Sequence, residues 1–278
     1  MADTRWKLVV DQQGVTISND RFHLTTEKPS VEGVSTVDDM VFGIDGSGQM
    51  ETIISELEAM TKRTYGQFCG LSRALEIVGE RWALFIVRDL LASPKTFSEL
   101  RHGLPRISTD VLVARLRELE HAGVIQRLVP PGPQDPLRYE LTEYGNELDE
   151  ITLKLGRWGA RLLGEPRPEE IVTTSSLIIA MRATFQQSAA AGLTVSYEIR
   201  MGEIVFHLLI DDGALKALPG PMPHADLRME PGMALKGLMS GEISPADADE
   251  NGIVYIGDPA LLAKFAQLFR IVGAPSRD

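Results

Sequence analysis

The amino-acid sequence predicts an α+β fold, in which two domains joined by a short linker follow a small N-terminal extension. Three observations predict this fold. Short amphipathic helices and then two strand-like runs fill residues 60–164, and residues 165–171 interrupt the pattern with glycine and proline. Residues 172–278 alternate between helical and strand periodicity, as expected for a sheet covered by helices. A chain of 278 residues is long enough for each domain to bury its own core.

The extension, residues 1–59, contains three short strand-like runs separated by turn-forming pairs: 7–10, 15–18 and 22–25. Residues 27–48 are polar and contain glycine, so they are predicted to form a linker or an irregular loop. Residues 49–60 carry apolar side chains at helical spacing and predict one helix. We interpret the extension as a solvated arm that strengthens a dimer.

The middle of the chain predicts three consecutive helices. An apolar helix over residues 82–91 stops before Pro94, because proline cannot continue a helix. Thr96 offers a side-chain oxygen to cap the second helix, and Ser108 caps the third. Gly123 supplies the left-handed residue that ends the third helix. Leucines at helical spacing form the inward stripe of this helix: Leu112, Leu116 and Leu119.

Two strand-like runs, residues 124–129 and 137–141, follow the third helix. The PPGPQDP sequence between them is too rich in proline to pair as a strand, so it is predicted to form the tip of a hairpin. Three helices followed by a hairpin describe a winged helix-turn-helix.

This middle segment resembles the HxlR family of bacterial winged-helix transcription factors over about residues 60–163. The likeness rests on these residues and segments: Cys69, 79–82, 96–100, 107–108, Leu112, 115–120, Gly123, 139–142 and Gly145. The resemblance implies a dimeric regulator that binds double-stranded DNA and inserts its third helix into the major groove.

The inward leucines and the resemblance together predict a DNA-reading surface. Its candidate residues lie at the helix entrances, on the outward face of the third helix and on the wing: Lys95, Thr96, Arg106, Ser108, Thr109, Val113, Arg117, Gln134 and Arg138. Ser108 and Thr109 suit hydrogen bonds to bases or phosphates. Val113 suits a thymine methyl group, and Arg117 suits a guanine or a phosphate. For each residue the alternative is a solvated surface position, and for Arg115 a structural salt bridge and a DNA contact both stay open.

The charge is unevenly distributed along the chain. In total, 28 basic and 39 acidic residues give a net charge of −11, which argues against a protein that coats nucleic acid indiscriminately. Residues 62–127, in contrast, hold 11 basic and 7 acidic residues, which suits selective DNA binding. The single cysteine fits a reducing cytoplasm, and no run approaches the ~18 apolar residues of a membrane span. We therefore expect a cytoplasmic protein that does not insert into membranes.

Cys69 has two interpretations. Some regulators in the resembled family sense oxidants through a cysteine near this position, and Lys62, Arg63 and Arg73 would favour its thiolate. Because the chain has no second cysteine, only an intersubunit bridge or a small-molecule cap could form. The alternative is a small apolar residue packed at the start of the first helix of the winged domain.

A helix capped by Thr142 is predicted over residues 143–163, with apolar side chains at three- and four-residue steps. In a protein that resembles the HxlR family, such a helix packs against its twin and makes the chain a homodimer. The candidate dimerisation residues are Leu155, Trp158 and Leu162. The alternative is a stripe that covers only the helix's own domain.

The last domain has these predicted elements, in order: a helix over 172–191, a hairpin over 193–201 and 203–211, a strand over 225–230, and helices over 231–241 and 259–272. Over about residues 172–272 it is similar to the sterol carrier protein type 2 family. The points of match are 225–227, Leu235, Leu238, Gly241, Ala246, Ala248, Val254, 256–258 and the helix 261–269.

This second resemblance implies a curved sheet roofed by helices, with an apolar cavity that holds a lipid-like molecule. The candidate pocket residues are all apolar: Phe206, Leu208, Ile210, Leu235, Leu238, Met239, Phe265 and Phe269. The alternative is that the same side chains fill a core without a cavity.

The sequence shows no HExxH, Walker lysine loop, GxSxG elbow or paired cysteine ligands, so we expect neither an enzyme nor a metal or cofactor site. It therefore predicts a one-component transcription factor, in which a winged helix that binds DNA is fused to a domain that responds to an apolar small molecule. Two alternatives stay open. One is a lipid-carrier or scaffold protein whose winged helix makes protein contacts, and the other is a regulator whose C-terminal domain only dimerises.

Overall fold

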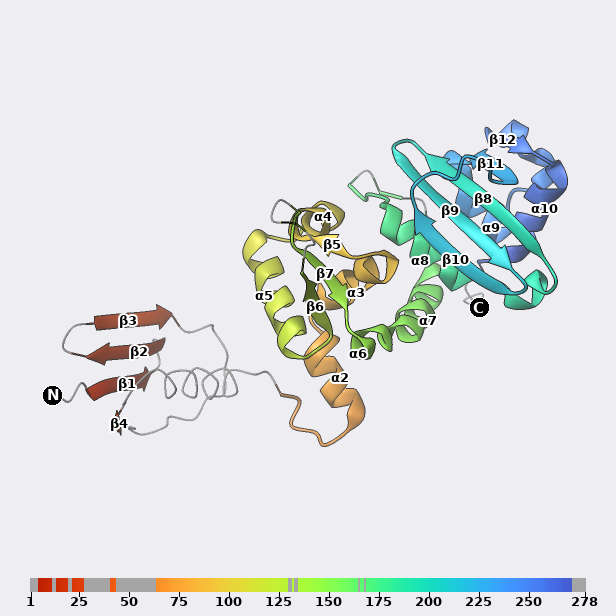
Figure 1. Ribbon diagram of the computed structural model, residues 1–278. Helices are drawn as coiled ribbons and strands as arrows, with labels where there is room; N and C mark the ends of the chain where they lie inside the picture. The colour runs from red at the N-terminus through yellow and green to blue at the C-terminus, as the bar shows by residue number, and fades with distance from the viewer. Residues whose placement is uncertain are drawn as a thin grey trace. The chain divides into compact units, whose positions relative to one another are not determined.

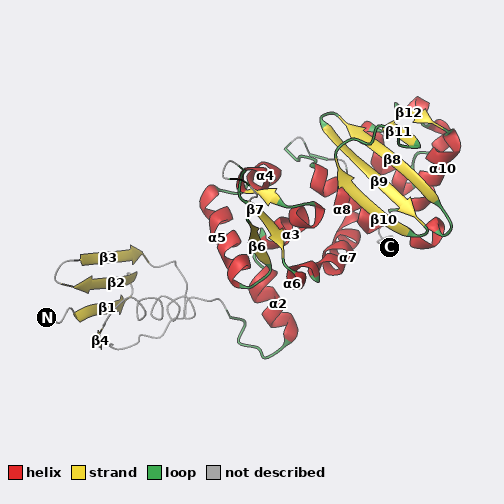
Figure 2. Ribbon diagram, in the orientation of Figure 1, coloured by secondary structure: helices red, strands yellow, loops and turns green. Residues whose placement is uncertain are grey.

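In the computed structural model, the described residues are 5–11, 14–19, 22–27, 41–43, 64–129, 132, 135–164, 166–167 and 169–271 (Figure 1). They belong to two compact units, residues 1–67 and 68–278. Figure 2 shows that the second unit combines helices with strands, in agreement with the predicted α+β class.

The first unit contains a four-stranded antiparallel sheet with the strand order β3-β2-β1-β4. Three of its strands confirm the three predicted runs: β1 (Arg5–Asp11), β2 (Gly14–Asn19) and β3 (Phe22–Glu27). The fourth, β4 (Val41–Gly43), corrects the prediction that residues 27–48 form a linker or loop. It forms because β1 offers a second edge, where Trp6 lies opposite Phe42. The helix predicted over residues 49–60 lies outside the described residues.

The second unit begins with the winged domain. Its helices and first short strand are α2 (Gly70–Val78), α3 (Ala83–Ala92), β5 (Lys95–Thr96), α4 (Phe97–Gly103) and α5 (Thr109–His121). Thr96 Oγ1 accepts from the N–H of Glu99 at 3.2 Å, and the Glu99 carboxylate accepts from the N–H of Thr96 at 2.6 Å. Ser108 Oγ accepts from the N–H of Val111 at 3.3 Å. Both predicted caps are confirmed.

The wing consists of β6 (Ile125–Leu128) and β7 (Arg138–Leu141), which pair antiparallel as predicted. Strand β5 adds to the other edge of β7, so the sheet has the order β5-β7-β6. Gly123 has a φ of +71°, which confirms the predicted left-handed end of α5. The domain's core is filled by aliphatic side chains that are 0–1% exposed, among them Ile86, Leu100, Leu112, Leu119 and Ile125.

Two helices, α6 (Glu143–Asn146) and α7 (Leu148–Ala160), replace the single helix predicted over residues 143–163. The predicted Thr142 cap is confirmed, because its Oγ1 accepts from the N–H of Gly145 at 3.0 Å. A Cβ on Gly145 would lie 1.9 Å from the carbonyl oxygen of Val124, so α6 sits directly against the backbone before β6. The chain then turns at Glu147, whose N–H donates to the Tyr144 carbonyl three residues earlier.

The C-terminal domain contains a five-stranded sheet with the order β10-β9-β8-β11-β12. Its strands are β8 (Thr194–Met201), β9 (Ile204–Asp211), β10 (Ala214–Pro219), β11 (Leu227–Glu230) and β12 (Val254–Gly257). All neighbours pair antiparallel except β11 and β8, which are parallel. The predicted hairpin and the β11 strand are confirmed, whereas β10 and β12 were not predicted.

The helical elements of this domain are α8 (Thr174–Thr184), the 3₁₀ helix η1 (Gln187–Ala190), the 3₁₀ helix η2 (Gly232–Ala234), α9 (Leu235–Ser240), the 3₁₀ helices η3 (Pro245–Asp247) and η4 (Asp249–Asn251), and α10 (Pro259–Leu268). The prediction of one helix over residues 172–191 is wrong. Phe185 leaves the helix with an extended backbone and forms a β-bridge with Phe269. The same bridge ends α10 before residue 272, the predicted end.

The core of the C-terminal domain lies on one face of the sheet, where α8, α9 and α10 cover it (Figure 1). Its centre is aromatic: the Tyr197 and Phe265 rings are 5.4 Å apart, and those of Phe265 and Phe269 are 4.7 Å apart. Along β8, residues that alternate with this apolar set are polar and point to the other face. Among them, Glu198 is 0% exposed.

Glu198 is held by two arginines and by the loop after β10. Its Oε1 accepts from Arg200 Nε at 2.7 Å, and its Oε2 accepts from the N–H of Met222 at 2.5 Å. Arg228 Nε lies 2.8 Å from Oε1, but its N–H is not directed at the carboxylate, so this contact is an ion pair without a hydrogen bond. Burial alone would raise the pKa of Glu198, yet the Met222 N–H and the arginines outweigh it and lower the pKa.

Candidate functional site

Helix α5 has a polar, exposed N-terminal end and a buried stripe of leucines along one side. Leu112, Leu116 and Leu119 are 0–3% exposed, whereas Ser108 and Thr109 at the start of the helix are exposed. Arg117 is exposed and Val113 is half-buried on the outward side. Between this side and the wing lies a small hollow of about 190 Å³, lined by Phe97, Val113, Leu116, Arg117, Glu120, Arg127 and Tyr139. The predicted helical phase is therefore confirmed.

Several cations near α5 have no ion-pair partner among the described residues. They are Lys95 on β5, Arg101 on α4 and Arg117 on α5. Arg106 is exposed and reaches Glu169 only at 3.8 Å. Sequence reasoning missed Arg101, although its position next to the inward Leu100 indicates that it leaves the core. These charges are available for an anionic partner.

Two further arginines are occupied by the protein itself. Arg138 Nη1 donates to the Pro94 carbonyl at 3.0 Å and to Glu99 Oε2 at 3.2 Å, so it joins the wing to the start of α4. Burial alone would raise the pKa of Glu99, but the hydrogen bonds from Thr96 and the charge of Arg138 outweigh it and lower the pKa. Arg115 lies 2.6 Å from Glu118 and 3.7 Å from Glu80, and its side chain is only 18% exposed. Of the two interpretations of Arg115, the structure therefore favours the salt bridge.

Gln134, a predicted wing contact, lies outside the described residues. Thr96 and Lys95 are half-buried, and Lys95 lies opposite Tyr139 in the small sheet. The predicted residues on α5 and β5 thus lie in the same domain, and β5 is part of its three-stranded sheet.

Helix α7 exposes large apolar side chains on one side. These are Ile151, Leu155, Trp158 and Leu162 just after the helix, with exposed fractions of 48–66%. Helix α2 and the residues before it expose a second set: Phe68, Leu71 and Leu75. Within the described chain, Leu155, Trp158 and Leu162 therefore do not cover their own domain. They are available to a partner.

The other side of α7 is bonded to α8. Arg182 Nη2 donates to Asp149 Oδ2 at 2.5 Å, and Arg157 Nε donates to the carbonyl of Ala183 at 2.6 Å. Ala92, the last residue of α3, contributes to the core of the C-terminal domain. The winged domain and the C-terminal domain therefore share direct contacts through α8.

Cys69 is exposed and caps α2, where its Sγ accepts from the N–H of Ser72 at 3.2 Å. The interpretation of Cys69 as a packed apolar residue is therefore wrong for the described chain. Its role as a helix cap offers a different structural reason for a cysteine here.

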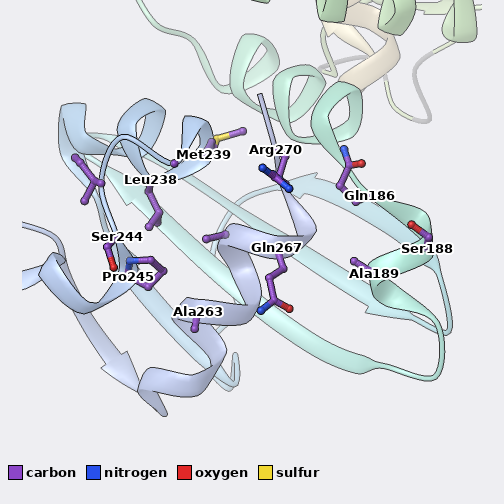
Figure 3. A pocket seen from close by; sticks show the side chains of 13 residues that line it. Gln186, Ser188, Ala189, Leu238, Met239, Ser244, Pro245, Ala263, Gln267 and Arg270 are labelled. Carbon is purple, nitrogen blue, oxygen red and sulfur yellow. The ribbon is translucent and has the colours of Figure 1, made fainter. Parts of the chain in front are cut away.

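The eight predicted pocket residues are all buried, with exposed fractions of 0–4%. All eight belong to the packed core, and these six lie only there: Phe206, Leu208, Ile210, Leu235, Phe265 and Phe269. The other two, Leu238 and Met239, also line a cleft of about 620 Å³ (Figure 3). The remaining lining comes from the segment after α8, the loop after α9 and α10: Gln186, Ser188, Ala189, Gly241, Ile243, Ser244, Pro245, Ala263, Ala266, Gln267 and Arg270.

Two properties of the described residues bear on other classes of protein. None of the helices among them is long and apolar enough to cross a membrane. Within the same residues, no group of three or more His, Cys, Asp or Glu side chains is arranged to hold a metal ion.

Comparison with known proteins identifies the winged domain. Residues 77–166 match the family model described as HxlR-like helix-turn-helix. The HTH-type transcriptional regulator YtcD of Bacillus subtilis is 38% identical over 101 residues, which cover 36% of this chain and 79% of YtcD. YvaP of the same organism, another HTH-type transcriptional regulator, is 38% identical over 86 residues, covering 31% of this chain and 80% of YvaP. The match to a solved structure of ytcD covers 34% of this chain and 95% of the chain in that structure, with 38% identity and a TM-score of 0.32. The chain belongs to the HxlR-like helix-turn-helix family of transcriptional regulators.

Proposed function

We propose that this transcriptional regulator binds double-stranded DNA as a homodimer and that its C-terminal domain senses an apolar small molecule. The DNA part rests on the exposed polar N-terminal turn of α5 and on Arg117, which has no ion-pair partner among the described residues, while the leucine stripe of the same helix is buried. A helix anchored in this way can enter a groove without disturbing its own core. We assign residues 60–164 to this domain, 165–171 to a linker and 172–278 to the sensor.

The proposed DNA contacts divide by chemistry. Ser108, Thr109, Val113 and Arg117 address base edges or nearby phosphates from the first turns of α5. The flanking residues Lys95, Thr96, Arg106, Gln134 and Arg138 address the backbone from the helix entrances and the wing. The bonds that Arg138 makes to Pro94 and Glu99 support a role in holding the wing in position for such contacts.

Dimerisation through α7 is supported by its apolar side. Trp158 and Leu162 are 64% and 66% exposed, and large apolar side chains with this exposure are stabilised when a partner covers them. A two-fold axis at α7 would present two copies of α5 to successive major grooves on one face of DNA.

The sensor function rests on the C-terminal domain. Helices on one face of a five-stranded sheet agree with the likeness to sterol carrier proteins, and Met239 offers an adaptable apolar surface. By hypothesis, a ligand changes DNA affinity only to the extent that it binds one arrangement of the dimer better than another. One alternative is a carrier or scaffold that uses the winged helix for protein contacts. The cations near α5 that have no ion-pair partner within the described part of the chain do not favour it. A C-terminal domain that only dimerises is the second alternative.

The test is fluorescence anisotropy of the purified full-length protein on DNA from around its own gene, in a salt series. We expect saturable binding that exceeds binding to random DNA by about a thousandfold or more. Because the proposed homodimer carries both residues twice, Arg117→Ala combined with Lys95→Ala should weaken binding and make the salt dependence shallower by up to about four units of slope. Lys216→Ala is the matched control, because Lys216 is an exposed cation on β10.

Equal affinity for every sequence, before and after lipids are stripped from the protein, would contradict the proposal. A double variant that binds DNA as well as the unmodified chain would contradict the assignment of α5 and β5 as the reading surface.

A further inference from the structure

Consecutive residues at the end of α8 form hydrogen bonds with two different elements, α7 and the end of α10. Toward α7, Arg182 bonds Asp149 and the carbonyl of Ala183 accepts from Arg157. The next residue, Thr184, is bonded to the chain just after α10: its carbonyl accepts from the N–H of Arg270 at 3.0 Å. This short stretch therefore connects the exposed apolar helix α7 to the end of α10.

Further bonds make the second connection firm. The N–H of Gln186 donates to the Leu268 carbonyl at 2.7 Å, and Phe185 forms a β-bridge with Phe269. The rings of Phe185 and Phe269 lie 5.6 Å apart. Main-chain bonds and a ring contact therefore join the backbone after α8 to the backbone after α10.

The cleft of about 620 Å³ opens at this junction (Figure 3). Gln186, Ser188 and Ala189 form one wall directly after α8, and Gln267 and Arg270 come from α10 and the residues that follow it. The volume lies within the range of about 300–1,000 Å³ that is typical of small-molecule sites. A molecule in the cleft would contact both of the segments that are joined here, the one after α8 and the one at the end of α10.

The lining combines an apolar surface with a polar edge. The apolar part consists of Ala189, Leu238, Met239, Ile243, Pro245, Ala263 and Ala266, and the polar part of Gln186, Ser188, Ser244, Gln267 and Arg270. Arg270 is exposed and has no ion-pair partner among the described residues. Among the described residues, no acidic side chain lines the cleft, and the only charged side chain of the lining is that of Arg270.

We infer that this cleft, outside the aromatic core, is the effector site and that its ligand is a small amphipathic anion. The guanidinium of Arg270 binds a carboxylate or phosphate group, which an arginine fork matches with two N–H bonds. The apolar part of the ligand lies on Leu238, Ile243 and Ala266. Binding shifts the position of the segment after α8, and this shift reaches α7 through Arg182 and Arg157. This inference rests on the sensing part of the proposed function.

Isothermal titration calorimetry tests the ligand class. The full-length protein is titrated with three probes of equal chain length. The probes are decanoate, decan-1-ol and decylammonium, and decyl phosphate is a fourth that separates a phosphate from a carboxylate head group. We expect decanoate or decyl phosphate to bind, and Arg270→Gln to weaken that binding by at least about tenfold, since a charge-assisted bidentate contact is lost. Lys264→Gln is the matched control: Lys264 lies on α10 but does not line the cleft.

Glutamine at position 270 keeps the backbone N–H that bonds Thr184, and an unchanged unfolding midpoint would verify that the variant folds. Decanol binding as tightly as decanoate, unchanged binding by Arg270→Gln, or no binding of any probe would each overturn the inference. DNA affinity without a probe is measured in parallel. Binding of the anions by a protein that fails to select DNA would remove the proposed function and leave the site intact.

Discussion

The carboxylate of Asp149 on α7 accepts a hydrogen bond from Arg182 on α8, with 2.5 Å between Oδ2 and Nη2. The pair joins residues that are 33 positions apart, across the segment that separates the winged domain from the sheet domain. The side chains are 33% and 24% exposed, so the contact is neither fully solvated nor fully buried. It makes α7 a shared element, with one side bonded to α8 and the other open.

A double-mutant cycle measures this contact. With Asp149→Asn and Arg182→Ala, singly and together, urea unfolding should give a coupling energy of about 0.5–1 kcal/mol, because the pair is partly screened by solvent. The exposed Glu150–Lys154 pair on the same helix is the control and should give a smaller value. Equal coupling in both pairs would show that the contact with α8 contributes no more to stability than an exposed pair within one helix.

Arg115 and Arg117 should separate stability from DNA binding. Arg115→Ala removes the contacts with Glu118 and Glu80, so we expect a loss of about 1 kcal/mol in unfolding free energy with little change in DNA affinity. Arg117→Ala should do the reverse, with about a tenfold loss of DNA affinity. Urea unfolding and anisotropy on the same two proteins check both. The opposite assignment would mean that Arg115 reads DNA.

Trp158→Arg should convert the proposed dimer to a monomer. A charge on the open side of α7 would be buried without a partner at the proposed interface, which is costly. Sedimentation velocity should show the molecular mass halved, and DNA affinity should fall because two half-sites are no longer bound together. Ile256→Arg on β12 is the control, since Ile256 is 67% exposed and Trp158 is 64% exposed. A dimeric Trp158→Arg protein would place the interface elsewhere.

Glu198→Gln should destabilise the C-terminal domain by about 2 kcal/mol, because Arg200 and Arg228 would lose their common counter-charge. The pKa of Glu198 is lowered in the folded state, so the unfolded state binds its proton more readily. The stabilisation is therefore fully present above the ordinary value of 4.5 and is lost as the pH falls through the folded pKa. Thermal unfolding as a function of pH should show a smaller acid loss in Glu198→Gln. Parallel curves for the two proteins would exclude Glu198 as the cause.

Cys69→Ser should leave folding and DNA affinity unchanged under reducing conditions, because a serine oxygen can accept the same bond from Ser72. Diamide then distinguishes the two roles of the cysteine. A fall in DNA affinity that occurs only in the unmodified chain would identify Cys69 as a redox centre. The same response in both proteins would leave Cys69 as a helix cap.

Local chemistry made the winged domain predictable. The caps at Thr96 and Ser108, the leucine stripe of α5 and the left-handed Gly123 each depend on a few neighbouring residues, so the sequence carries them directly. The polar entrance of α5 follows from the same periodicity. The helical phase alone does not decide the role of Arg115, because its partner Glu80 lies 35 positions earlier in the chain.

Distant pairing accounts for what the sequence did not reveal. Strand β10 has the sequence ALKALP, which has little tendency to be extended, and it forms because β9 offers an edge. Phe185 leaves its helix because Phe269 is across from it. The cleft also depends on distant pairing: the sequence shows that Leu238 and Met239 are apolar, but part of the polar edge comes from the segment after α8.

The parallel pairing of β8 with β11 has a consequence for synthesis of the chain. When the ribosome has released residues up to 220, the β8-β9-β10 meander can already form from local contacts, while the inner edge of β8 stays open. Until β11 arrives, this edge exposes unpaired amides beside apolar side chains and can pair with another nascent chain. Slow translation or truncation between residues 220 and 230 should therefore favour aggregation more than the same change before residue 194.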